Sequence, residues 1–206
     1  MKRMRKATIL ILMLALLLTV GCGSSNPVTP PWPPELPVFL NVPEVTQDII
    51  DEFIFRLLQP FGFIPDIDTW GYDNVWGGME AVFSQALEDN NDLLAEVTLV
   101  TMGEIGLIEF MPTLIGAVGQ YPYSTCYALR NMRSDYAVYI LIEELDNTDL
   151  FVRDVSVSSL AEFPYFGEYP YAHERAIVAL EWRLGVESEA WIRENIIDAI
   201  VSIRGI

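Results

Sequence analysis

Apolar residues recur at helical spacing in the segment 94–118, and the rest of the chain repeats this pattern. Leu94, Val97, Met102 and Ile105 lie at relative positions 0, 3, 8 and 11, so they form one apolar stripe along a helix. Gly106 follows the last of them, at the place where a glycine commonly ends a helix in the left-handed conformation. The segment therefore predicts a helix that ends at this glycine.

A second helix is predicted over 109–118, directly after the first. Pro112 lies in its first turn, where the missing backbone N–H costs little. The apolar residues of this helix have the spacing 0, 3, 4 and 7, and they are Met111, Leu114, Ile115 and Val118. The two helices and the turn between them make one helical hairpin.

The pattern of the first helix recurs three more times along the chain. Matches at positions 0, 3, 7, 8 and 11 start at Tyr121, Val152 and Ile192, so the four starts lie 27, 31 and 40 residues apart. A helical hairpin of this kind buries its apolar face by stacking on its neighbours. We therefore expect an all-α fold, a short α-solenoid of about four helix pairs.

The same criteria place the remaining elements. Thr46 and Ser134 are expected to begin helices as N-caps, and Gly185 is expected to end one. The aromatic segment 61–78 is expected to be a loop. The predicted helices span residues 47–58, 79–87, 93–105, 109–118, 123–132, 135–145, 150–163, 171–184 and 189–203.

Three segments resemble a known repeat. MGEIGLIEFMPTLIGAV (102–118) resembles the HEAT-like repeat of the phycocyanobilin-lyase type, and FVRDV (151–155) and WIREN (191–195) resemble its valine-arginine helix start. The resemblance covers 78–204 and implies a solenoid whose second helices line the concave face. It also implies that Arg153 and Arg193 pair with acids of neighbouring repeats. A bilin-lyase-like enzyme or chaperone is the alternative function that it suggests.

The first 21 residues have the pattern of an export signal. Four basic residues precede 14 uncharged, mostly aliphatic residues, a stretch too short to span a bilayer comfortably. The sequence 18–22, LTVGC, resembles a bacterial lipobox, which implies cleavage before Cys22 and lipidation of its thiol. Gly23, in place of an aspartate, favours the outer membrane by the same resemblance. We expect a lipid-anchored cell-envelope protein, with a plain secretory signal or an uncleaved anchor as alternatives.

The chain then divides into four parts. Residues 1–21 are the lipoprotein signal peptide, and 22–45 form a Pro/Ser-rich tether that cannot make a helix. Residues 46–77 hold the N-terminal capping helix and the aromatic loop, and 78–206 hold the HEAT-like repeats.

The charge balance limits the kinds of partner. The formal charge is −17, and loss of the four basic residues of 1–21 makes it −21, from 8 arginines against 29 acids. A surface this acidic repels nucleic acid and anionic headgroups, so neither is an expected partner. The acidity suits a basic protein partner. It also suits divalent cations, and it is expected as well of a merely solvated solenoid or of a structural envelope protein adapted to high salt.

Catalytic and metal-binding constellations are not recognisable. His173 is the only histidine and has no nucleophile motif beside it, and Cys126 is expected to be a buried small hydrophobe. Asp66, Asp68 and Asp73 do not match a calcium loop, because Gly77 falls where its bidentate glutamate belongs. We predict no enzyme activity, no cofactor and no metal site.

A partner-binding face is expected opposite the apolar stripe of each second helix. Positions 2, 6 and 9 lie on that side at 100° per residue, and by the resemblance they form an acidic groove with a tyrosine-arginine centre. The insertion EFPYFGEYPY (162–171) either packs over helix ends or forms an exposed docking patch. The candidate partner-binding residues from both features are Tyr123, Tyr127, Arg130, Asp154, Ser158, Glu194, Asp198, Tyr165, Phe166 and Tyr169. The alternative for the face is that it is merely solvated.

Overall fold

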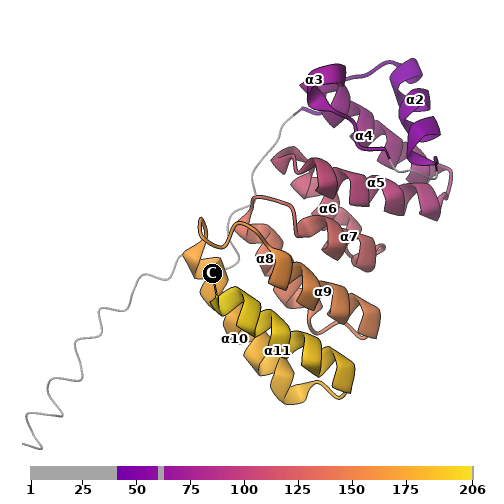
Figure 1. Ribbon diagram of the computed structural model, residues 1–206. Coiled ribbons are helices and arrows are strands. Elements are labelled where there is room, and N and C mark those ends of the chain that lie inside the picture. Colours follow the sequence, from indigo (N-terminus) through magenta and orange to yellow (C-terminus); the bar gives the residue numbers. More distant parts are fainter. Residues whose placement is uncertain (1–40, 60–62, 206) are drawn as a thin grey trace, which may run out of the picture. The chain divides into compact units, whose positions relative to one another are not determined.

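The structure, a computed structural model, describes residues 41–59 and 63–205, and these contain α-helices and no strand. Figure 1 shows their arrangement. The helices are α2 (Gln47–Leu57), α3 (Ile67–Trp70), α4 (Tyr72–Glu88), α5 (Asp92–Ile105), α6 (Met111–Ala117), α7 (Pro122–Leu129), α8 (Asp135–Glu144), α9 (Leu150–Glu162), α10 (Pro170–Val186) and α11 (Ala190–Arg204), with a 3-10 turn, η1 (Ile108–Phe110), before α6. The predicted all-α class is confirmed.

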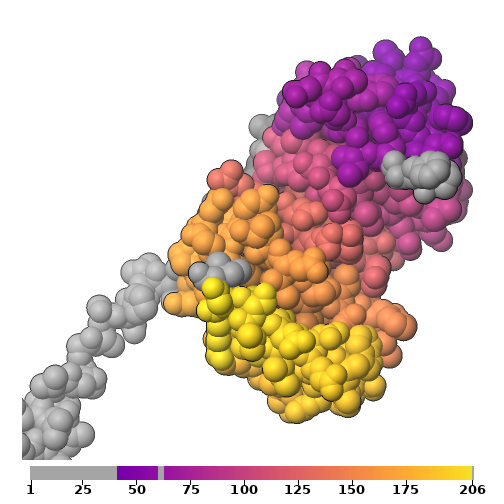
Figure 2. Space-filling view, viewed as in Figure 1, coloured from indigo at the N-terminus to yellow at the C-terminus, as the bar shows by residue number. Residues whose placement is uncertain are grey.

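Helices that follow one another in sequence pack against one another. The pairs α4 with α5, α6 with α7, α8 with α9 and α10 with α11 are each in contact, and α5, α7, α9 and α11 contact one another in series. Figure 2 agrees, because the colours change in chain order across the visible face. One apolar cluster runs through all these pairs, from Phe53 on α2 to Ile203 on α11.

The starts of the repeated pattern lie in this cluster. Leu94, Val152 and Ile192 are buried at equivalent places near the starts of α5, α9 and α11, and Tyr121 is buried just before α7. Gly106 ends α5 in the left-handed conformation with φ of 71°, as the sequence predicts. The predicted Ser134 cap is also present, since its side chain accepts a hydrogen bond from the backbone N–H of Tyr136. Thr46 lies at the N-cap position of α2, but its side chain makes no capping hydrogen bond.

The expectation of a loop over 61–78 is wrong, because α4 begins at Tyr72. Gly77 and Gly78 are helical residues that admit close neighbours. A Cβ on Gly77 would lie 2.2 Å from the Pro43 carbonyl oxygen, and one on Gly78 would lie 2.7 Å from the Phe53 ring. The glycine pair therefore serves helix packing, not chain reversal.

Gly185 does not end a helix, contrary to the prediction. α10 continues through it to Val186, and Gly185 does not adopt a positive φ. The chain leaves the helix at Glu187, whose buried carboxylate is held by two arginines. A polar network, rather than a left-handed glycine, therefore accompanies this helix end.

Candidate functional site

The outward-facing side chains of α5, α7, α9 and α11 form the candidate site, called here the second-helix face. Six acids lie on these helices away from the apolar stripe, and they are Glu96, Glu104, Asp154, Glu162, Glu194 and Asp198. Tyr123 is 53 % exposed near the start of α7. The face therefore combines acidic groups with an accessible aromatic ring.

Arg130 joins three successive helices of this face. Its guanidinium donates to Glu162 of α9 at 2.8 Å and, more distantly, to Glu104 of α5 at 3.4 Å. The Tyr127 hydroxyl accepts from it at 2.7 Å, and the guanidinium carbon lies 3.9 Å from the centre of that ring. The structure thus brings the predicted tyrosine and arginine together, and it engages the arginine with two acids of the same chain.

The α9–α11 end of the face is held by another contact between helices. The Asn195 side-chain amide donates to the Asp154 carboxylate at 2.7 Å, and the Ser158 hydroxyl donates to the Val155 carbonyl. Glu194 and Asp198 of α11 are exposed. Both carboxylates are therefore accessible to a partner.

The insertion 162–171 packs against the protein. Phe166 is 2 % exposed and contacts the rings of Phe163 and His173, with centroid distances of 5.0 Å and 5.2 Å. Its candidate role in partner binding is therefore corrected, because the side chain lies in the core. Tyr165 and Tyr169 are half-buried, and the Tyr169 hydroxyl donates to the Arg133 carbonyl. This geometry matches the packing alternative for the insertion.

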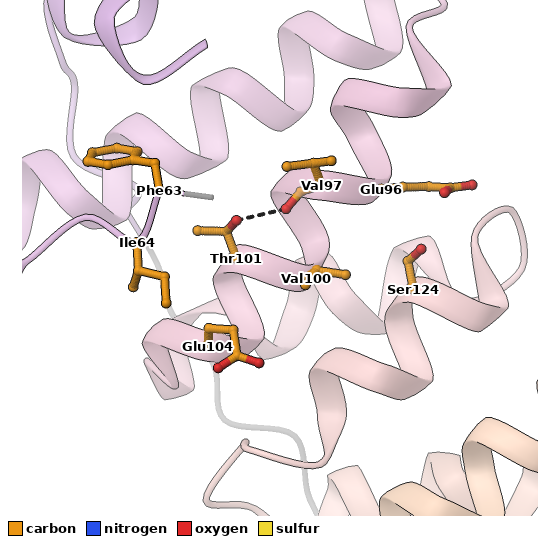
Figure 3. A pocket seen from close by; sticks show the side chains of 8 residues that line it. All are labelled: Phe63, Ile64, Glu96, Val97, Val100, Thr101, Glu104 and Ser124. Carbon is orange, nitrogen blue, oxygen red and sulfur yellow. Dashed lines mark hydrogen bonds between the residues drawn. The ribbon is translucent and has the colours of Figure 1, made fainter. Parts of the chain in front are cut away.

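A groove of about 340 Å³ opens at the α5 end of the second-helix face (Figure 3). Val97, Val100 and Thr101 of α5 form its floor. Phe63 and Ile64 close one side, and Ser124 of α7 lies on the other. The groove is deep enough for an apolar side chain of a partner to enter.

The floor of the groove is apolar and its ends are acidic. The Thr101 hydroxyl donates to the Val97 carbonyl at 2.8 Å, so this polar atom is satisfied within α5 (Figure 3). Glu96 and Glu104 line the groove eight residues apart on the same helix, which corresponds to about 12 Å. An apolar slot between two separated carboxylates is complementary to an apolar group between two cations.

Positions 2 and 6 of the first repeat, Glu96 and Val100, were expected on this face, but the other groove residues were not. Phe63 and Ile64 belong to the aromatic segment that was expected to be a loop, and no local pattern links that segment to α5. The available signal was the concentration of apolar residues in a segment otherwise expected to be solvated.

Arg153 has the structural role that the repeat resemblance implies. Its guanidinium donates to both carboxylate oxygens of Glu187, at 2.9 Å and 3.1 Å, and Arg183 adds donors from the other side. Burial alone raises the pKa of Glu187, but the bonds from the two arginines and from the Glu189 N–H outweigh it and lower the pKa to about 2. The same expectation is wrong for Arg193, which donates to the backbone carbonyls of Leu184 and Glu187 in its own helix pair and forms no ion pair with an acid of the described residues.

A second cavity of about 340 Å³ lies between α4 and α6, away from the second-helix face. The acidic residue that lines this cavity is Glu80, whose carboxylate accepts a hydrogen bond from the Thr113 hydroxyl at 2.7 Å. Burial raises the pKa of Glu80 and the single hydrogen bond from Thr113 lowers it less. This acid is engaged by a neutral donor of its own chain, so the cavity does not present the paired charges of the groove.

The remaining reactive groups are engaged in structure. Cys126 is buried, and loss of solvation raises its pKa to about 12, which keeps the thiol protonated. A nitrogen of the His173 ring lies 2.9 Å from the Ile203 carbonyl. The side chain of Asp66 accepts a hydrogen bond from the backbone N–H of Asp68 at the start of α3. Over residues 41–59 and 63–205, no group of three His, Cys, Asp or Glu side chains is placed to hold a metal ion.

Cys22 and the signal and tether that surround it lie outside the described residues. Within the part that the structure describes, no helix is both long and apolar enough to cross a bilayer. Comparisons with protein-family models, curated proteins and solved structures found no match for this chain.

Proposed function

We propose that this protein is a non-catalytic interaction scaffold of the cell envelope, built as a HEAT-like α-solenoid. The serial contacts of α5, α7, α9 and α11 support the solenoid, because each helix pair of such a protein packs on the next. The buried Arg153–Glu187 pair, which links the helix pairs α8–α9 and α10–α11, supports the HEAT-like character.

The observation that carries the binding function is the imbalance of charge on the second-helix face. Six acids line it, and Arg130 is the cation at its centre, already bonded to Glu162 and near Glu104. Such a surface attracts basic proteins and speeds their association. The partner we propose is accordingly a basic protein, and we do not propose nucleic acid, because a chain of net charge −17 repels it.

We further propose that Cys22 carries the lipid and holds the scaffold at the membrane, with the outer membrane as its location. Radiolabelled palmitate tests the anchor in a bacterial host that expresses the full chain. Incorporation should disappear in Cys22→Ala. Incorporation that continues unchanged in this variant would refute lipidation at Cys22, whereas the scaffold proposal would be unaffected.

Charge reversal on α11 tests the binding function. The tagged full chain is recovered from detergent-solubilised envelopes of its source, and the partners that co-purify are quantified. Glu194→Lys with Asp198→Lys should lose the partner that binds the face, because both acids are exposed there. Glu143→Lys with Glu174→Lys, on α8 and α10, is the control, because it reverses the same number of exposed charges away from the face. Equal recovery with both double variants would contradict binding at the second-helix face.

A further inference from the structure

The groove beside α5 has the shape and charge of a peptide-binding site. We propose that it binds an extended peptide segment in which two basic side chains, four residues apart, flank an apolar side chain. The inference rests on the proposed function, since it specifies what the face recognises in a partner protein. The inference can fail while the proposed function holds, because synthetic peptides test it without the partner protein.

The spacing of the two acids defines the spacing of the two bases. Glu96 and Glu104 are about 12 Å apart along α5. An extended chain advances about 3.3 Å per residue, so residues i and i+4 are about 13 Å apart. Side chains at i, i+2 and i+4 also point to the same side of an extended chain. Both bases and the apolar residue midway between them can therefore face α5 together.

The groove favours an extended segment over a helix. Its volume of about 340 Å³ suits one large apolar side chain and the adjoining backbone, whereas a helix with its side chains is about 10 to 12 Å across. Phe63 and Ile64 on one side of the floor restrict its width (Figure 3). The apolar side chain enters between them and Val100.

Glu104 remains available to a ligand although it lies near Arg130. The Arg130 guanidinium is closer to Glu162, at 2.8 Å, than to Glu104, at 3.4 Å. The side chain of Glu104 also keeps 32 % of its surface exposed. A peptide cation can thus replace a long contact without leaving Arg130 unpaired.

Fluorescence anisotropy with labelled heptapeptides tests the proposal on the full chain in detergent. The probe is SRSLSRS, which has the predicted spacing. SRRLSSS has the same composition with adjacent arginines, and SRSSSRS lacks the apolar residue. SRSLSRS should bind at least fivefold more tightly than either, and its affinity should fall as salt is raised, because the charged contacts are solvent-accessible.

Variants of the protein locate the site. Glu96→Gln and Glu104→Gln should each weaken binding of SRSLSRS about two- to fivefold, the range of exposed ion pairs. Glu143→Gln with Glu174→Gln, two exposed acids on α8 and α10 away from the second-helix face, should leave its affinity unchanged. Circular dichroism confirms that all variants fold.

Three results would overturn the groove assignment: equal affinity for both arginine spacings, no binding at millimolar peptide, or equal weakening by the Glu143→Gln, Glu174→Gln control variant. If the peptides fail while the partner is still lost on charge reversal of α11, the groove specificity is wrong and the scaffold function stands. If charge reversal on α11 also leaves the recovery of every partner unchanged, the scaffold proposal fails as well.

Discussion

The guanidinium of Arg153 on α9 donates two hydrogen bonds to the carboxylate of Glu187, which lies 34 residues later at the end of α10. The Glu187 side chain has no exposed surface, and Arg153 is 10 % exposed. Arg183 and the N–H of Glu189 complete the shell of donors around the same carboxylate. A charge buried so fully is tolerated because each of its oxygens is hydrogen-bonded.

Removal of the Glu187 charge should destabilise the fold strongly. Glu187→Gln leaves the Arg153 guanidinium buried without its counter-ion, and loss of one partner of a buried ion pair costs about 3 to 5 kcal/mol. Urea denaturation at neutral pH measures this free energy of unfolding. Glu194→Gln, an exposed site on α11, is the control and should change it by less than about 0.5 kcal/mol. A small effect at Glu187 would show that the pair is not an important part of the core.

The same carboxylate should make the stability depend on pH below about 4.5. Its pKa is about 2 in the folded protein, lower than the ordinary value of 4.5. The unfolded state therefore binds the proton first as the pH falls, and this contribution is complete above pH 4.5 and is lost between about 4.5 and 2. The difference between wild type and Glu187→Gln in urea denaturation should shrink over that interval. A difference in stability that stays constant down to pH 2.5 would show that Glu187 is not the source of the pH dependence.

The close packing of α5 on α7 depends on Gly103. A Cβ at this position would lie 2.4 Å from the Cα of Ala128. Gly103→Ala should therefore force the helices apart and destabilise the protein by about 1 to 3 kcal/mol, despite the better helix propensity of alanine. Gly116→Ala in α6 is the matched control, because its Cβ would meet no atom of another described segment within 4 Å. In thermal unfolding, Gly103→Ala should lower the melting temperature, whereas Gly116→Ala should leave it unchanged or raise it slightly.

Phe166 should behave as a core residue rather than as a docking residue. Phe166→Ala should cost about 3 to 5 kcal/mol of stability, as is usual for a buried phenylalanine. Tyr123→Ala removes a ring that is 53 % exposed and should cost less than about 0.5 kcal/mol. Chemical denaturation of the two variants distinguishes the roles. Equal, small effects would mean that the insertion 162–171 does not pack as described.

Local patterns were sufficient to predict most of the helices and most of the core, but not α3 or the first turns of α4. The apolar spacing places Leu94, Val152 and Ile192 correctly because burial on one side of a helix imposes a period in the sequence. Asn195 lies at a position of the apolar stripe, but it is exposed. Its side-chain amide donates a hydrogen bond to the carboxylate of Asp154 on α9. Contacts of this kind have no periodic signal.

Packing between distant segments explains what the sequence did not reveal. The resemblance anticipated that Arg153 pairs with an acid, but the choice of Glu187 among 29 acids depends on how α9 meets the end of α10. Gly77 and Gly78 look like a turn until Pro43 and Phe53 are placed against them. The groove likewise exists only because Phe63 and Ile64 lie beside α5.

Site-specific photo-crosslinking tests the central claim, binding of a partner at the second-helix face, most directly. The crosslinker benzoylphenylalanine replaces either Tyr123 on α7 or Leu87 on α4, two residues that are exposed by 53 % and 39 %. We expect irradiation of cells to give a discrete adduct from the Tyr123 position and none from the Leu87 position. An adduct from Leu87 alone, or the same adduct from both positions, would contradict binding at this face.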